Sequence, residues 1–170
     1  MVTTPGQSGS VTRCFASDAA GTESVAAGIA AHCASGTRIY LQGDLGAGKT
    51  TFARGFLRAL GYAGTVRSPT YTLVESYQTG HGPVFHFDLY RLKTPDELEA
   101  MGFRDYFDGS GICLVEWAER AETLLGIPDL QVRLQPQGDG RMIELIAHTP
   151  VGDAALPKAP PSYPPSATSH

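Results

Sequence analysis

Apolar residues recur along the chain with two different periods, so that helical and extended stretches alternate. Two stretches with helical spacing end shortly before Gly36 and Gly61, and glycine is the residue that most often ends a helix. A third stretch opens with Thr94-Pro95-Asp96-Glu97, a capping box with proline at the first helical position. The pattern therefore predicts helices from Ser17 or Thr22 to about Cys33, from Thr50 to Leu60, from Thr94 onward, and near Ala118–Leu125.

The extended stretches are short and differ in pattern. Ile112–Val115 is continuously apolar, which is typical of a strand buried on both faces of a sheet. Gln137–Gly140 is typical of a hairpin turn. Strands are predicted over Val11–Phe15, Arg38–Leu41, Tyr71–Tyr77, Val84–Tyr90, Ile112–Val115, Leu130–Leu134 and Met142–Ala147. Together these elements predict an α/β domain with at least one βα unit and added antiparallel strands.

Composition excludes several classes of protein. With 170 residues, 42% apolar and 18% charged, the chain fits one globular domain and is neither a coiled coil nor wholly disordered. No apolar run approaches the roughly 18–20 residues of a membrane span, and Met1–Ser10 lacks the pattern of a secretory signal. We therefore expect a cytoplasmic protein. A net charge of −4 argues against broad binding to a nucleic-acid backbone.

The two ends of the chain differ from its middle. Residues 151–170 hold five of the 12 prolines, which block helices and remove donors from sheets. We predict a flexible N-terminal segment over residues 1–10, one folded domain over 11–149, and a proline-rich disordered tail over 150–170.

The motif that carries chemistry lies between the predicted strand at 38–41 and the predicted helix at 50–60. Residues 43–50, GDLGAGKT, match the phosphate-binding loop GxxxxGK[ST] at every specified position. Glycines let successive N–H groups point at phosphates, while Lys49 reaches the β- and γ-phosphates and the Thr50 hydroxyl ligates Mg²⁺. We predict an ATP and Mg²⁺ site formed by Gly43, Asp44, Leu45, Gly46, Ala47, Gly48, Lys49, Thr50 and Thr51.

A phosphate loop also needs an acidic residue that holds Mg²⁺ or orients water. Asp88 closes the alternating run Val84–Phe87, Glu116 closes the apolar run Ile112–Val115, and at least one of them is expected to take this part. The spacing does not decide which residue does what. His86 lies on the same face of its strand as Asp88, but we interpret it as a structural histidine.

Five segments, in this order, resemble the TsaE (YjeE) family, the bacterial ATPases of tRNA threonylcarbamoyladenosine biosynthesis. The segments are GDLGAGKTT at 43–51, SPTYTLVESY at 68–77, HFDLYRL at 86–92, ELEAMGFRDYF at 97–107 and LVEW at 114–117. They cover roughly residues 12–148. The resemblance implies a P-loop NTPase-like fold, with a mixed, mainly parallel β-sheet flanked by helices.

The resemblance also implies a function. Members of the family bind ATP, hydrolyse it weakly, and support the formation of N6-threonylcarbamoyladenosine at position 37 of tRNA. They act with the transferase TsaD and its paralogue TsaB and contact tRNA indirectly, through that complex. ATP hydrolysis is needed for repeated turnover of the complex. This chain departs from the family at Ala118, where proline commonly follows the Glu-Trp pair.

The site residues carried over by the resemblance fall into two groups. For catalysis it implies Lys49 as the phosphate cation, Asp88 as the acid that assists hydrolysis, and Glu116 with Thr50 as the Mg²⁺ ligands. For nucleotide binding it implies contacts from Thr70, Trp117 and Arg141, which would lie near the γ-phosphate, the nucleotide and its base respectively.

Two other functions share the phosphate loop and stay open at this point. A small-molecule kinase would transfer the γ-phosphoryl group to a metabolite, although Arg91, Arg104 and Arg120 are scattered singly, without a basic lid segment. A nucleotide-gated binding module would use ATP as a switch, with hydrolysis incidental.

Overall fold

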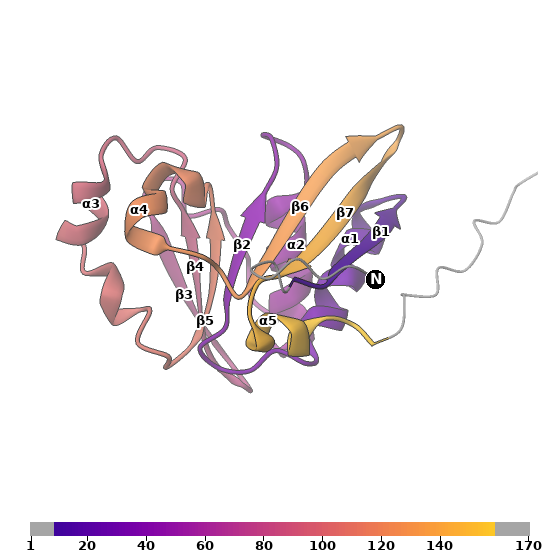
Figure 1. Ribbon diagram of the computed structural model, residues 1–170, viewed down its shortest axis with the longest axis horizontal. Helices are drawn as coiled ribbons and strands as arrows, with labels where there is room; N and C mark the ends of the chain where they lie inside the picture. The colour runs from indigo at the N-terminus through magenta and orange to yellow at the C-terminus, as the bar shows by residue number, and fades with distance from the viewer. Residues whose placement is uncertain (1–8, 159–170) are drawn as a thin grey trace, which may run out of the picture.

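One mixed β-sheet organises the computed structural model, which describes residues 9–158 (Figure 1). Its seven strands lie in the order β1-β7-β6-β2-β5-β4-β3. The strands are β1 Val11–Ala16, β2 Arg38–Gln42, β3 Val74–Thr79, β4 Gly82–Asp88, β5 Ile112–Glu116, β6 Leu130–Gln137 and β7 Gly140–Ala147.

The direction of the strands confirms the predicted fold class. Strands β6, β2, β5 and β4 run parallel in the centre, whereas β1 and β7 are antiparallel at one edge and β3 is antiparallel at the other. Parallel neighbours bring the carboxyl ends of β2, β4 and β5 to one edge of the sheet, where α/β folds bind their ligands.

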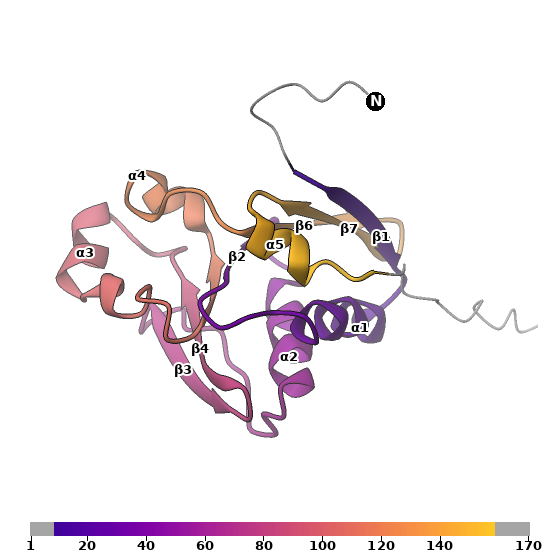
Figure 2. The ribbon, with the colours of Figure 1, turned by 60° about the horizontal axis from the view of Figure 1, so that its bottom comes forward.

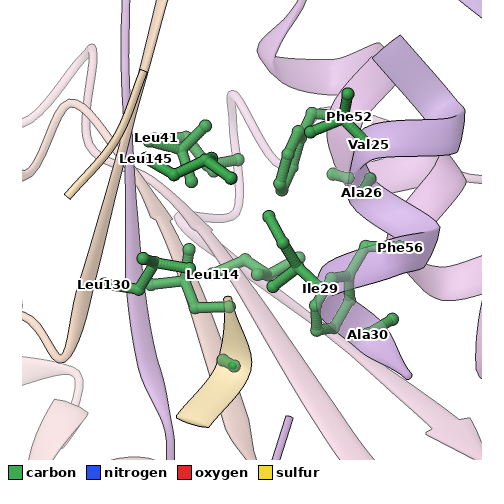
Figure 3. Close-up of a cluster of buried hydrophobic side chains, with 14 of the residues drawn as sticks. Val25, Ala26, Ile29, Ala30, Leu41, Phe52, Phe56, Leu114, Leu130 and Leu145 are labelled. Carbon is green, nitrogen blue, oxygen red and sulfur yellow. The ribbon is translucent and has the colours of Figure 1, made fainter. Parts of the chain in front are cut away.

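Helices α1 (Ala19–Ala30) and α2 (Lys49–Ala59) lie together on one face of the sheet (Figure 2). Small residues on α1 allow close approach, and Phe52 and Phe56 of α2 are fully buried. Figure 3 shows these side chains pointing toward Leu41, Leu114, Leu130 and Leu145 of four strands. Burial of each large apolar side chain contributes about 1.5–3 kcal/mol, so this layer firmly anchors the helix that follows the phosphate loop.

The opposite face carries a second apolar cluster beneath shorter helices. These are α3 (Pro95–Ala100), the 3₁₀ turns η1 (Phe103–Asp105) and η2 (Ala118–Ala121), and α4 (Glu122–Leu125). Along β5 the residues alternate between the layers: Leu114 faces α1 and α2, while Cys113 and Val115 face the second cluster. No helix within residues 9–158 is long and apolar enough to cross a membrane.

Several predicted boundaries shift in the structure. Helix α1 begins after Asp18, whose carboxylate accepts a hydrogen bond from the Gly21 N–H at 2.8 Å, rather than at Ser17 or Thr22. Strand β3 starts at Val74, because the preceding residues form a turn in which Leu73 has φ +66°. Strand β4 ends at Asp88, earlier than predicted.

The prediction of a disordered tail from residue 150 is wrong for its first part. Pro150–Ala155 form helix α5, in which Pro150 takes the first helical position and Thr149 caps the N-terminus by accepting from the Gly152 N–H. A Cβ at Gly152 would overlap the Asp129 carbonyl, so glycine is required for this close packing. The rest of the predicted tail, from residue 159, and residues 1–8 of the predicted N-terminal segment lie outside the described residues.

Candidate nucleotide-binding site

The phosphate loop joins β2 to α2 at the carboxyl edge of the sheet. Gly46 and Gly48 have φ +79° and +108°, the left-handed region that favours glycine. A Cβ at Gly48 would overlap the guanidinium of Arg141, so a glycine at this position also leaves room for the arginine side chain. Helix α2 begins at Lys49, so its free N–H groups face the loop, as phosphate binding requires.

Lys49 lies inside this loop. Its Nζ donates to the carbonyl oxygen of Gly43 and, at 3.5 Å, to that of Asp44, and it lies 4.0 Å from the centre of the Trp117 ring. Burial lowers the pKa of Lys49, whereas the nearby carboxylates of Glu116 and Asp88 act in the opposite direction. The ammonium group therefore lies between the loop and both predicted acids.

A cavity of about 490 Å³ opens in front of the loop and brings most of the predicted site together. Of the predicted residues, Leu45, Gly46, Gly48, Lys49, Thr50, Thr51, Thr70, Asp88, Glu116, Trp117 and Arg141 line it. Gly43, Asp44 and Ala47 do not. Gly43 and Asp44 instead line a neighbouring depression of about 340 Å³, and Ala47 is buried.

Three lining residues were not predicted as site residues: Ser68, Tyr90 and Arg91. Ser68 belongs to the segment SPTYTLVESY, close to Thr70, and Arg91 belongs to HFDLYRL, close to Asp88. This proximity in the chain to predicted site residues could have indicated both of them. The Arg91 guanidinium lies 4.5 Å from the centre of the Tyr71 ring, on the rim of the site.

Asp88 ends β4 and is 5% exposed. Its Oδ2 accepts a hydrogen bond from the Ser68 hydroxyl at 2.7 Å, and its Oδ1 accepts from the Tyr90 N–H at 3.0 Å. The Ser68 hydroxyl also lies 3.1 Å from that of Thr70. A chain of hydroxyl groups therefore connects the segment that contains Thr70 to the carboxylate.

Glu116 ends β5 as the register partner of Asp88 and is 3% exposed. Its Oε2 lies 2.6 Å from Nε2 of His86, which is fully buried on β4. The predicted alternation holds, since His86 and Asp88 face the same side of the sheet as Glu116. Asp88 and Glu116 line the cavity, whereas His86 lies buried behind Glu116.

Trp117 and Arg141 border the cavity from different elements. Trp117 has φ +59°, a backbone conformation that turns the chain directly after β5, and its ring lies 5.0 Å from that of Tyr90. Arg141, on β7, donates from Nη1 to the Ala47 carbonyl at 3.2 Å. Arg141 therefore contacts the phosphate loop itself, and its predicted contact with the base stays a prediction.

The oxygen donors at the cavity fit the predicted metal. Mg²⁺ prefers hard oxygen ligands and is usually held by one or two carboxylates together with substrate phosphates. The Thr50 hydroxyl and the carboxylates of Asp88 and Glu116 supply such oxygens within one cavity.

Comparison with known proteins identifies the family of the chain. A family model described as "Threonylcarbamoyl adenosine biosynthesis protein TsaE" matches residues 16–143. This chain belongs to the TsaE family. The resemblance seen in the sequence segments is thereby confirmed.

Individual members of the TsaE family align over most of the domain. The tRNA threonylcarbamoyladenosine biosynthesis protein TsaE of Haemophilus influenzae is 51% identical over 121 residues, which are 71% of this chain and 77% of that protein. The protein of the same name from Bacillus subtilis is 44% identical over 118 residues, 69% of this chain and 73% of that protein. A crystal structure of Bacillus subtilis YdiB superposes with a TM-score of 0.76 at 32% identity, covering 88% of this chain and 94% of that one.

Proposed function

We propose that this chain is a partner-dependent ATPase that supports the formation of N6-threonylcarbamoyladenosine in tRNA. The observation that carries the proposal is the convergence of Lys49, Thr50, Asp88 and Glu116 on one cavity in front of the phosphate loop. Membership of a family named for threonylcarbamoyladenosine biosynthesis supplies the pathway. The partners would be the transferase TsaD and its paralogue TsaB, with tRNA bound through them.

The chain's own residues would divide the work of phosphoryl transfer to water. N–H groups of the loop and Lys49 bind and orient the phosphates, which is the main contribution a phosphate loop makes. Thr50 and Glu116 would hold Mg²⁺, which neutralises charge on the phosphates when it is bound. Asp88, next to the same cavity, would orient the attacking water.

The arrangement of the arginines supports dependence on a partner. Hydrolysis in phosphate-loop enzymes often needs a further cation on the transferred group, supplied in cis or in trans. Arg91 lies against Tyr71 on the rim, and Arg141 is bonded to the Ala47 carbonyl. Neither arginine is therefore free to contact the transferred phosphate as it lies. That cation would come from a movement of one of these side chains or from the partner, so we expect the isolated chain to hydrolyse ATP slowly.

The test compares ATP hydrolysis by the chain alone and with the TsaD–TsaB heterodimer and substrate tRNA. We expect stimulation by the partners, and a loss of at least about 100-fold in Lys49→Ala and Glu116→Ala, because each removes a charge from the reacting centre. Lys93→Ala is the matched control, since Lys93 is exposed outside the cavity.

Three outcomes would contradict the proposal. Fast hydrolysis by the isolated chain that partners leave unchanged would exclude partner dependence. Robust transfer of phosphate to a metabolite would support a small-molecule kinase. Intact ATP binding with full support of tRNA modification after hydrolysis is abolished would support a nucleotide-gated module.

A further inference from the structure

His86 is a fully buried polar side chain directly behind the cavity. It lies on β4 opposite Leu114 of β5, two residues before Asp88, and reaches diagonally to Glu116. Its Nε2 lies 2.6 Å from Glu116 Oε2, both groups being almost completely shielded from solvent. Because a carboxylate oxygen only accepts hydrogen bonds, Nε2 is the donor.

The other ring nitrogen shows what this histidine contributes. Within the described residues, Nδ1 of His86 is the one buried side-chain nitrogen or oxygen without a hydrogen-bond partner. An unsatisfied buried polar atom costs about 1–3 kcal/mol, which an apolar side chain at this position would avoid. Among residues 9–158, the bond from Nε2 to Glu116 is the one hydrogen bond of this side chain, and an apolar side chain could not make it.

The bond engages only one oxygen of the carboxylate. Glu116 lines the cavity, and no hydrogen bond from residues 9–158 reaches its second oxygen, Oε1. The histidine therefore fixes the orientation of the Glu116 side chain while one oxygen is left for a ligand. Groups that hydrogen-bond to metal-binding side chains in this way typically change metal affinity by about 10- to 100-fold when they are removed.

We propose that His86 is a positioning residue that orients the Glu116 carboxylate for Mg²⁺ through the Nε2–Oε2 hydrogen bond. This inference rests on the proposed ATPase function and adds to it a residue that touches neither nucleotide nor metal. It also assigns a role to a side chain that is otherwise a costly member of the apolar core.

The experiment uses the full chain and three variants. His86→Leu removes the donor, and His86→Gln places an amide N–H close to the position of Nε2. Val84→Ala is the matched control, since Val84 is fully buried two residues earlier on the same face of β4 and pairs with Ile112, four residues before Glu116 on β5. Trp117, the chain's one tryptophan, reports binding of a non-hydrolysable ATP analogue by fluorescence in saturating Mg²⁺ and in EDTA.

The expected result is a selective loss of the metal effect. His86→Leu should reduce the Mg²⁺-dependent gain in analogue affinity by about 10- to 100-fold and leave the affinity in EDTA unchanged. His86→Gln should recover most of that gain. Val84→Ala should lower the melting temperature without changing either affinity.

Three results overturn the inference, and a fourth points elsewhere. If His86→Leu behaves like Val84→Ala, or if His86→Gln loses as much as His86→Leu, the hydrogen bond does not orient Glu116 for the metal. If the wild-type chain binds the analogue equally well in Mg²⁺ and in EDTA, Glu116 does not hold the metal and the role of His86 fails with it. If the wild-type chain does not bind the analogue at all, the proposed nucleotide site itself is wrong.

Discussion

Asp88 and Glu116 are register partners at the ends of neighbouring parallel strands and are almost equally buried, yet different parts of the protein hold them in place. Glu116 is bonded to His86, a side chain of the core. Asp88 is bonded to the Ser68 hydroxyl and the Tyr90 N–H, both from segments that line the open cavity. The position of Glu116 therefore depends on the core, whereas that of Asp88 depends on the segment around Ser68.

This difference suits the two roles proposed for the acids. A carboxylate that holds a metal works best with a fixed orientation, because hydrogen-bonded neighbours tune its affinity. A carboxylate that orients water must be correctly placed only when the phosphate is bound. The link from Thr70 through Ser68 to Asp88 provides a physical route by which binding at the γ-phosphate would place this acid.

The largest expected effect comes from Asp88→Asn, which removes the charge but keeps the size of the side chain. Partner-stimulated hydrolysis should fall by about 100- to 10,000-fold, the usual contribution of a positioned acid–base group. Binding of ATP, followed by Trp117 fluorescence, should persist because the phosphate loop is unchanged. A variant with full hydrolysis would remove Asp88 from the mechanism and leave Glu116 to act alone.

A smaller effect is expected from Ser68→Ala, which tests whether the loop positions Asp88. A hydrogen bond to a charged group contributes about 1.5–3 kcal/mol. Since Ser68 is half-buried, we expect the lower end of that range, a decrease in kcat of about tenfold, with the affinity for ATP retained. Steady-state hydrolysis with the partners present measures kcat, and Trp117 fluorescence measures the affinity for ATP.

Thr72→Ala is the control for Ser68→Ala. Thr72 is an exposed residue of the same segment, and its hydroxyl donates to the Val74 carbonyl and to Glu75, not to Asp88. Equal losses in the two variants would mean that the order of the whole segment matters, rather than the bond from Ser68 to Asp88.

The sequence predicted those parts of the site that depend only on the order and direction of the strands. Each acid comes directly after a β-rich run, and parallel strands bring their carboxyl ends together, so Asp88 and Glu116 could be placed near the phosphate loop in advance. The same holds for the face shared by His86 and Asp88, since side chains alternate along a strand.

What the sequence could not predict are contacts between elements. The bond from His86 to Glu116 depends on the register of β4 against β5, and that of Arg141 to Ala47 depends on the hairpin of β6 and β7. Helix α5 was missed for a local reason. The five prolines that predict a disordered tail all lie beyond Ala155, whereas the helix starts at Pro150, which follows the cap Thr149 at a position where proline is favoured.

The smallest effect on activity is expected from Thr149→Ala, at the opposite end of the sheet. The Thr149 hydroxyl caps α5 and donates to Asp129 at 2.7 Å, while the second Asp129 oxygen accepts from the Arg38 N–H at the start of β2. Loss of the cap should lower the free energy of unfolding by about 0.5–2 kcal/mol, measured by urea denaturation. Thr149→Ser keeps both hydrogen bonds and should retain the wild-type stability.

Hydrolysis and Mg²⁺-dependent binding should stay at wild-type levels in Thr149→Ala at temperatures well below its melting transition. The reason is that Glu116 is held by His86 and Asp88 by Ser68, contacts that lie at the other edge of the sheet. A decrease in hydrolysis as large as that of Ser68→Ala would show that the acids depend on the integrity of the whole sheet. The contrast between a carboxylate held by the core and one held by a loop would then have to be abandoned.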